Sequence, residues 1–125
     1  MTKAAALHNF YSSFGLTAYE ENTVPTGDAA PEYPYLTYNV VTGSLDNDVS
    51  LNCSLWYRGD SWLKANAKAE EISKAIGQGG KIIPCDGGAI WIKRGAPFAQ
   101  SMGDPSDDLV KRKYINLTAE FFTAD

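Results

Sequence analysis

The sequence holds few of the side chains on which catalytic and metal sites usually depend. It contains one histidine, His8, and two cysteines, Cys53 and Cys85. A serine or cysteine nucleophile normally needs a histidine base, and structural zinc sites need clusters of cysteine and histidine. Two isolated cysteines also cannot form the several disulfides of a small secreted scaffold. We therefore expect no catalytic residues, no metal and no cofactor, and we expect both cysteines to be reduced and buried.

Long apolar runs and an excess of positive charge are missing as well. The N-terminal segment MTKAAALHNF has a single lysine and only a four-residue apolar run, which is too short for the core of a signal peptide. No stretch approaches the roughly 18 apolar residues that a membrane-spanning helix needs. The net charge is −4, whereas domains that bind nucleic acid concentrate lysine and arginine. The sequence thus predicts a soluble protein of the cytoplasm without a membrane partner.

Length and composition are those of an ordinary folded domain. The chain has 125 residues, of which 44% are hydrophobic and 12% aromatic, so one domain over residues 1–125 is expected. Apolar periodicity and turn residues predict the order of its elements. The expected segments are a helix from the Thr2 cap to Phe14, an extended segment over 16–24, strands over 35–42 and 49–58, a helix over 62–76, a hairpin over 80–95 and a strand over 113–122.

Two segments are expected to lie outside regular structure. Residues 25–34 contain three prolines and one glycine, which excludes a central strand. Residues 96–110 are interpreted as an irregular connection before the last strand. Short links between neighbouring elements favour a mostly antiparallel sheet with two helices packed on one face. The predicted fold class is therefore α+β, with two layers.

Two overlapping motifs stand between the second strand and the second helix. Arg58-Gly59-Asp60 matches an adhesion tripeptide, and Gly59-Asp60-Ser61 matches the start of a serine-esterase signature. An esterase of that type needs a histidine near its C-terminus, and no histidine follows His8. The tripeptide would need display on a flexible loop, but here it joins a strand to a helix. We interpret the segment as a junction, in which Gly59 makes the turn and Asp60 or Ser61 caps the helix.

The segment GDPSDDLVKRKY has acidic residues followed by basic ones. One interpretation is a short helical turn capped by Ser106, with acids at its positive end and bases at its negative end. The other, compatible with the first, is a bipolar patch that suits head-to-tail packing of identical subunits in a ring. We predict subunit-interface roles for the charges of this segment, for two apolar anchors before it and for two acids of an exposed loop: Asp104, Asp107, Asp108, Lys111, Arg112, Lys113, Phe98, Met102, Asp46 and Asp48. The two apolar residues have a second interpretation, in which they only cover the edge of the sheet.

The order of these segments resembles that of the tail-terminator, or tail-completion, proteins of long-tailed bacteriophages and prophages. The likeness rests on the N-terminal helix, the proline-rich loop before PYLTYNVVTG, the strand VSLNCSLWYR, the helix SWLKANAKAEEISKAI, the hairpin and the closing strand YINLTAEFF. It covers nearly the whole chain and depends on pattern and length, not on an invariant motif. Head–tail connector proteins of similar size share much of this pattern.

The resemblance implies a virion structural protein without catalytic residues. Such proteins form a homo-oligomeric ring, typically of six subunits, that caps the tail tube, ends its polymerisation and presents a surface to the head connector. The implied partners are further copies of the chain, the tail tube protein and the head–tail connector protein, with DNA only as cargo in the channel. The implied location is the head-proximal end of the tail in the virion, after assembly in the host cytoplasm. An acidic ring would keep DNA from adhering, because contacts with phosphates need lysine and arginine.

Two other functions stay open on the residues alone. A small non-enzymatic binding or adaptor domain, working as a monomer or dimer, would lack catalytic motifs in the same way, as would another head–tail connector component. An enzyme is not expected, because the sequence has a single histidine and no nucleophile–base pair, metal cluster or phosphate-binding loop. The mass of the protein in solution distinguishes a ring from a monomeric or dimeric adaptor.

Overall fold

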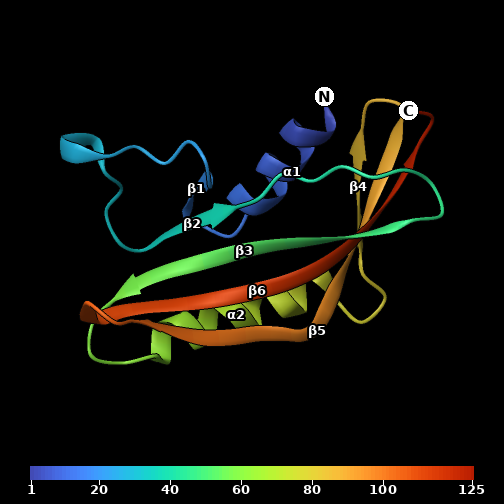
Figure 1. Cartoon of the computed structure of the whole chain (residues 1–125). Helices are drawn as coiled ribbons and strands as arrows, with labels where there is room; N and C mark the ends of the chain where they lie inside the picture. Colours follow the sequence, from blue (N-terminus) through green and yellow to red (C-terminus); the bar gives the residue numbers. More distant parts are fainter.

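A curled six-stranded sheet with two helices forms the body of the protein, and the computed structural model describes all of residues 1–125. The elements are α1 (Lys3–Ser12), β1 (Thr17–Glu20), the short 3-10 helix η1 (Gly27–Ala29), β2 (Tyr35–Tyr38), β3 (Asp48–Arg58), α2 (Leu63–Ile76), β4 (Lys81–Cys85), β5 (Gly88–Asp104) and β6 (Asp107–Thr123). The strands lie in the order β1-β2-β3-β6-β5-β4 and curl like a half-barrel (Figure 1). β1 and β2 are parallel, and all other neighbours are antiparallel. The predicted order of elements and the mostly antiparallel sheet are confirmed.

Each helix begins next to a side-chain hydroxyl that accepts a hydrogen bond from a backbone N–H of its first turn. The Thr2 hydroxyl accepts a hydrogen bond from the Ala5 N–H (3.1 Å) at the start of α1, as expected. This helix ends two residues earlier than predicted. The Ser61 hydroxyl accepts a hydrogen bond from the Leu63 N–H (3.0 Å) at the start of α2, so the predicted strand-to-helix junction is confirmed. Neither helix combines the length and the apolar character that a bilayer crossing requires.

The segment over residues 96–110, expected to be irregular, differs most from the sequence-based prediction. β5 continues through it to Asp104, and β6 returns from Asp107 after a tight turn. The helical turn capped by Ser106 is also wrong, because the charged residues after Ser106 belong to β6. β5 and β6 thus form one long hairpin, in addition to the expected shorter hairpin of β4 and β5 (Figure 1).

A β-bulge explains why this hairpin was not recognised. The register between β5 and β6 passes from Arg94 directly to Ala99, so the intervening residues 95–98 are left out of the pairing. They include a glycine and a proline, which normally indicate a loop but are also typical of bulges. The glycine and the proline therefore predicted the end of a strand at a place where the strand only bends.

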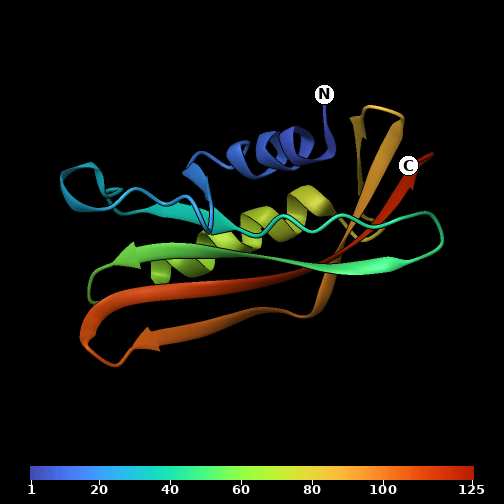
Figure 2. The same ribbon diagram turned by 45° about the horizontal axis from the view of Figure 1, so that its top comes forward.

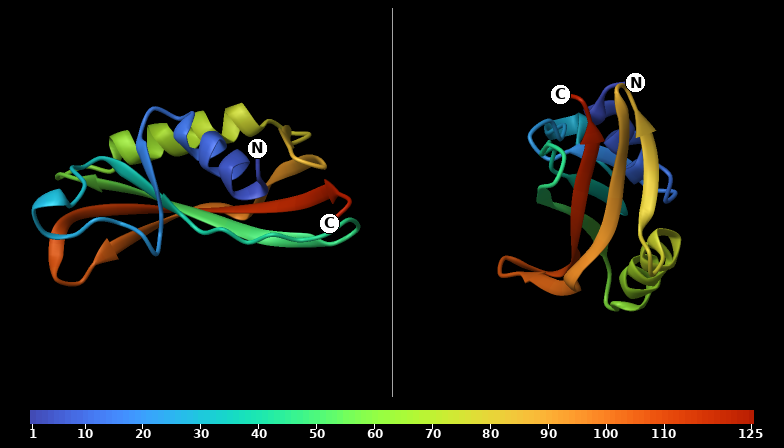
Figure 3. Two further views of the ribbon diagram at one scale, coloured as in Figure 1. Left: turned by 90° about the horizontal axis from the view of Figure 1, so that it is seen from above. Right: turned by 90° about the vertical axis from the view of Figure 1, so that its right-hand side faces the viewer.

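Both helices share one core with a single face of the sheet. Leu7 and Phe10 of α1 and Ile72 and Ile76 of α2 belong to the same buried cluster. Alternate strand residues belong to the same cluster: Leu36, Tyr38, Leu51, Cys53, Leu55, Ile83, Ile90, Ile92, Ile115, Leu117, Ala119 and Phe121. Figure 3 shows both helices on the same side of β3 and β6. Because the sheet is strongly curled, the predicted two-layer arrangement stays a prediction. Both cysteines are free, but Cys85 is only half-buried, against expectation.

The phenol of Tyr11 is a buried polar group without a hydrogen-bond partner. Its ring stacks on that of Tyr38, with 4.6 Å between the centroids. Leaving such a group unpaired costs about 1–3 kcal/mol. We expect Tyr11→Phe to raise the free energy of unfolding by about 1 kcal/mol, measured by urea denaturation at neutral pH. Tyr38→Phe is the matched control and should destabilise the protein, because it removes a hydroxyl that is hydrogen-bonded to Nδ1 of His8 (2.8 Å).

The wild-type protein and Tyr11→Phe should also differ in how much stability they lose at alkaline pH. Burial, and then the neighbouring Cys53 and Tyr38, raises the pKa of Tyr11 well above its ordinary value of 10.0. The unfolded chain therefore loses this proton at a lower pH than the folded chain, so wild-type stability falls as the pH rises above about 10. The Tyr11→Phe protein lacks the group and should lose less stability over this range. Equal losses in both proteins would contradict the burial of this phenol.

Candidate interaction surface

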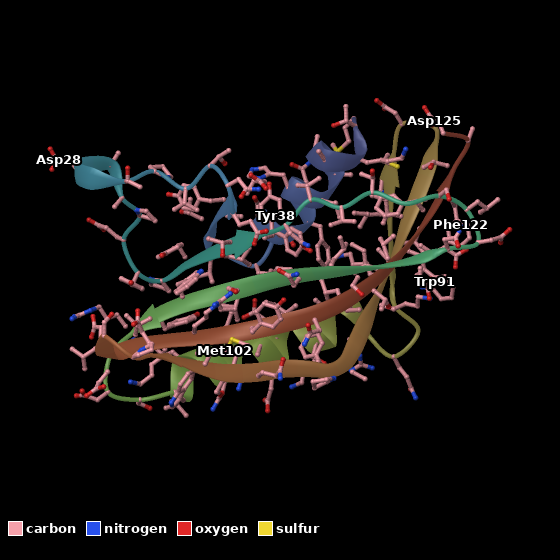
Figure 4. The ribbon with its side chains drawn as sticks, in the orientation of Figure 1. Asp28, Tyr38, Trp91, Met102, Phe122 and Asp125 are labelled. Carbon is pink, nitrogen blue, oxygen red and sulfur yellow. The ribbon has the colours of Figure 1, made fainter.

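Large side chains form a row on the face of the sheet that has no helix. Tyr35 of β2 lies opposite Trp56 of β3. Arg112 of β6 lies between Trp56 and Met102 of β5. These four residues, here called the aromatic row, therefore cross four strands in register, where opposite side chains are close enough to touch. Figure 4 looks onto this face, with α2 behind the strands and Met102 labelled on β5.

Ring stacking and a cation–π contact join Tyr35, Trp56 and Arg112 within the aromatic row. The rings of Tyr35 and Trp56 are nearly parallel, at 11°, with 6.0 Å between their centroids. The guanidinium carbon of Arg112 lies 4.9 Å from the centroid of the Trp56 ring and 5.4 Å from that of Tyr114. Tyr33 extends the row beyond Tyr35, at a centroid distance of 5.3 Å. Such cation–π and aromatic contacts stabilise a fixed arrangement of partly exposed side chains.

Two small buried residues beside the aromatic row, on the same face of the sheet, fix the orientation of its polar atoms. Trp56 Nε1 donates a hydrogen bond to Oγ1 of Thr37 (2.8 Å). Arg112 Nε donates one to Oγ of Ser54 (3.0 Å). Both hydroxyl-bearing residues are buried. The indole and the guanidinium are thus held before any partner arrives, which lowers the entropy cost of binding.

The outer end of the Arg112 side chain has no acidic partner within the chain. The ion pairs of the protein join Arg58 to Asp107, Lys68 to Glu71, Lys93 to Asp48, and the N-terminus to Asp86. The Nε–H bond to Ser54 leaves the four N–H groups of the two terminal nitrogens without a protein acceptor. Arg112 borders a surface hollow of about 240 Å³, which is also lined by Trp56, Gly103, Asp104, Pro105 and Val110. The structure therefore presents a guanidinium with its fork free.

Two of the predicted interface acids are used within the hairpin turn. Asp104 Oδ1 accepts hydrogen bonds from the N–H (2.9 Å) and the hydroxyl (2.7 Å) of Ser106. These bonds, the backbone one first, hold the pKa of Asp104 below its ordinary value. Asp107 Oδ1 accepts a hydrogen bond from the Leu109 N–H (3.0 Å), and its Oδ2 lies 3.4 Å from a terminal nitrogen of Arg58. Both carboxylates thus shape the turn, whereas Asp108 beside them is exposed without such a bond.

The three predicted interface bases do not all lie on one surface. Strand alternation puts Lys111 and Lys113 on the helix side and Arg112 on the opposite face. The amino groups of Lys111 and Lys113 lie 5.9 and 6.0 Å from the centroid of the Trp62 ring, next to the start of α2. Lys113 also donates to the hydroxyl of Ser101 (2.9 Å). The predicted bipolar patch is therefore divided between two faces by the strand that was read as a helical turn.

Phe98 and Lys113 line the same groove between α2 and the hairpin. This groove has a volume of about 370 Å³ and is also lined by Asn66, Ala69, Glu70, Ser73 and Ala99. Phe98 packs against the main core from its place in the bulge. Its position agrees with the interpretation that it covers the sheet, and an additional role at an interface stays a prediction. Met102 lies on the opposite face, in the aromatic row.

The last two predicted residues, Asp46 and Asp48, lie far from the hairpin turn. They are at the start of β3, whereas the hairpin turn lies beside the end of that strand, at the opposite end of the molecule (Figure 1). Asp46 has a left-handed backbone, with φ of 69°, in an exposed turn. Asp48 is 3.4 Å from the amino group of Lys93. The structure therefore divides the predicted residues among the turn, two faces of the hairpin and a separate loop.

Charge is separated between the two sides of the sheet. Residues 4–57 contain six acidic residues and no lysine or arginine. They form most of α1, all of β1 and β2, and nearly all of β3. From Arg58 onward the chain has ten basic and nine acidic residues. Since β1 and β2 are at one edge of the sheet and β5 and β4 at the other, one edge is acidic and the other carries both signs.

The aromatic residues of the row were missed at the sequence level, although a signal for them exists. In β3 the apolar residues alternate with Ser50, Asn52 and Ser54, and Trp56 stands in the same alternation as these polar residues. A large aromatic side chain on the solvent face of a half-buried strand indicates a contact surface. The position of Tyr35 opposite it depends on strand pairing, which no local pattern gives.

No cluster of three or more histidine, cysteine, aspartate or glutamate side chains is arranged to hold a metal ion. His8 is engaged with Tyr38, and its Nε2 is 3.4 Å from the Ser12 hydroxyl, without an acid beside it. No protein-family model matches the chain, and no curated protein matches it.

Proposed function

We propose that the protein is a tail-terminator-like structural protein of a phage or prophage, which assembles as a homo-oligomeric ring, caps the tail tube and forms the joining surface for the head connector. The observation that carries this proposal is the separation of charge across the sheet. An acidic edge and a base-containing edge on one subunit can pair between copies, head to tail. Such a heterologous contact closes into a ring when the rotation between copies allows it. We expect six copies, with the helices as one layer of each subunit and the curled sheet as the other.

Open strand edges support the same proposal. β1 has no neighbour on its outer side. β5 pairs with β4 only over Gly88–Ile92, so its second half, after the bulge, is also an edge. Unpaired backbone N–H and C=O groups at such edges are ready to pair with another chain. A subunit with one free edge at each side of its sheet is suited to a closed circle of neighbours.

A small binding or adaptor domain is the second candidate, favoured by the aromatic row. Exposed tryptophan, tyrosine and arginine side chains are enriched where protein interfaces gain most of their energy. In this alternative the row would bind a different protein, and the chain would stay a monomer or dimer. Another head–tail connector component would use the same surfaces with different neighbours.

Mass in solution tests the ring directly. Light scattering over a range of protein and salt concentrations should give a species of about six 13.6 kDa chains, which shifts toward smaller species as salt screens the charges. Purified tail tubes provide a template if the ring forms only on its partner, and labelled protein should then appear at one end of each tube. A strict monomer that also ignores tail tubes would reject the ring and leave the adaptor. A strongly basic channel in the assembled ring would contradict the expectation that DNA passes without adhering.

A further inference from the structure

An acidic segment and the hollow beside Arg112 complement each other, but they do not meet within one chain. The segment over residues 25–33 lies between β1 and β2 and carries η1. It projects beyond β1 and β2 in both Figure 1 and Figure 2, and Figure 4 places Asp28 at its tip, well away from Met102. Asp28 and Glu32 are exposed, and neither takes part in an ion pair of the chain. The segment adjoins the aromatic row of its own chain through Tyr33, but its two carboxylates form no ion pair with Arg112 of that chain.

We propose that the segment over residues 25–33 of one copy docks on the aromatic row of the next copy, with a carboxylate of Asp28 or Glu32 on the terminal nitrogens of Arg112. This inference rests on the proposed ring and identifies the surfaces that would join its subunits. A guanidinium with both terminal nitrogens free can bind a carboxylate through two parallel hydrogen bonds. The partner is therefore a second copy of this chain, and the contact is heterologous.

The rest of the segment also fits the surface around Arg112. Its sequence PTGDAAPEY supplies alanine and proline side chains beside the two acids. The hollow has apolar walls from Trp56, Pro105 and Val110. The segment comes from the part of the chain that has no lysine or arginine, so nothing in it opposes the guanidinium. The receiving surface itself has the tryptophan, tyrosine, methionine and arginine side chains in which protein interfaces are enriched.

One charge in the hollow works against an incoming acid. Asp104 lines the hollow together with Arg112, although its Oδ1 is already bonded to Ser106. Asp104→Asn removes this negative charge while an asparagine can keep the turn, because asparagine and aspartate form the same side-chain–backbone bond. Asp104→Asn should therefore strengthen the association between copies, whereas loss of the charge on Arg112 should weaken it.

A charge exchange between two variants tests the contact. Arg112→Glu should lose the basic surface on which the segment docks. The double substitution Asp28→Lys with Glu32→Lys should lose the acidic charges of the segment itself. Each variant alone should be folded by circular dichroism but dissociate, with affinity between copies reduced by roughly 30-fold or more. Mixed in equal amounts, they should assemble with the mass of the wild-type species, because every contact then joins opposite charges when the two variants alternate. Arg112→Lys is the conservative control and should weaken assembly less, since it keeps the charge and loses the fork.

The outcomes distinguish this contact from the proposed ring itself. A wild-type ring whose variants both still assemble alone would overturn the contact and leave the ring in place. Variants that dissociate alone and stay apart when mixed would overturn the pairing of these two surfaces. A wild-type protein that is monomeric at every concentration and does not bind tail tubes would overturn the contact and the ring together. The double variant Asp28→Lys with Glu32→Lys changes only an exposed loop without ion pairs, so its result does not depend on the folding of β6.

Discussion

Phe121→Ala should lower the free energy of unfolding by about 4 kcal/mol, whereas Phe122→Ala should lower it by about 1 kcal/mol or less. The two residues are neighbours in β6, but Phe121 is 0% exposed and Phe122 is 37% exposed. Phe121 belongs to the core shared by both helices. Truncating it removes a large apolar side chain and leaves a cavity that the packed surroundings can only partly fill.

The comparison works because the two changes are chemically identical. Phe122 stacks on Trp91 at the surface, with 6.1 Å between the centroids, so its loss removes one partly solvated contact. Urea denaturation should be followed at one protein concentration for all three proteins, because association adds to apparent stability. If β6 were shifted by one residue, the two side chains would exchange faces, and the larger loss would move to Phe122→Ala. The pair is therefore a test of strand register as well as of burial.

The sequence predicts those parts of the fold in which neighbouring residues share one environment. Ala65, Ala69, Ile72 and Ile76 recur at helical spacing, and all four are buried in α2. The alternation of β3 likewise identifies its core side in advance, with Leu51, Cys53 and Leu55 buried. Each of these patterns can be read without knowledge of what lies opposite, which is why both elements were predicted.

The long hairpin was not predicted because its signals are ambiguous at short range. Residues 95–98 bend the strand without ending it, and glycine and proline indicate either outcome. The error had a direct effect on the candidate site. Read as a helical turn, Lys111, Arg112 and Lys113 would be grouped as one patch, whereas a strand sends Arg112 to the opposite face. The aromatic row depends in addition on the pairing of β2, β3, β6 and β5, which brings together residues from distant parts of the sequence.

Gly88→Ala should lower the free energy of unfolding by about 3 kcal/mol or more, because the first residue of β5 has no room for a side chain. A Cβ atom there would lie 1.8 Å from the backbone oxygen of Phe122. That oxygen belongs to the paired strand β6, so relief requires a shift of the sheet itself. The residue also has φ of 154°, in a region that other residues rarely adopt.

Gly59→Ala separates these two causes. Gly59 has nearly the same backbone angle, with φ of 159°, and no atom within 4 Å of the position a Cβ would take. Its substitution should therefore cost only the backbone term, about 1 kcal/mol. The difference between the two variants, measured by urea denaturation, then reports the contact between the start of β5 and the end of β6. Equal losses of unfolding free energy in the two variants would show that β5 and β6 do not approach so closely at Gly88. The pairing of the start of β5 with the end of β6 would then be wrong. A larger loss for Gly88→Ala than for Gly59→Ala would establish that Gly88 is needed because a side chain does not fit there, and not because of its backbone angle.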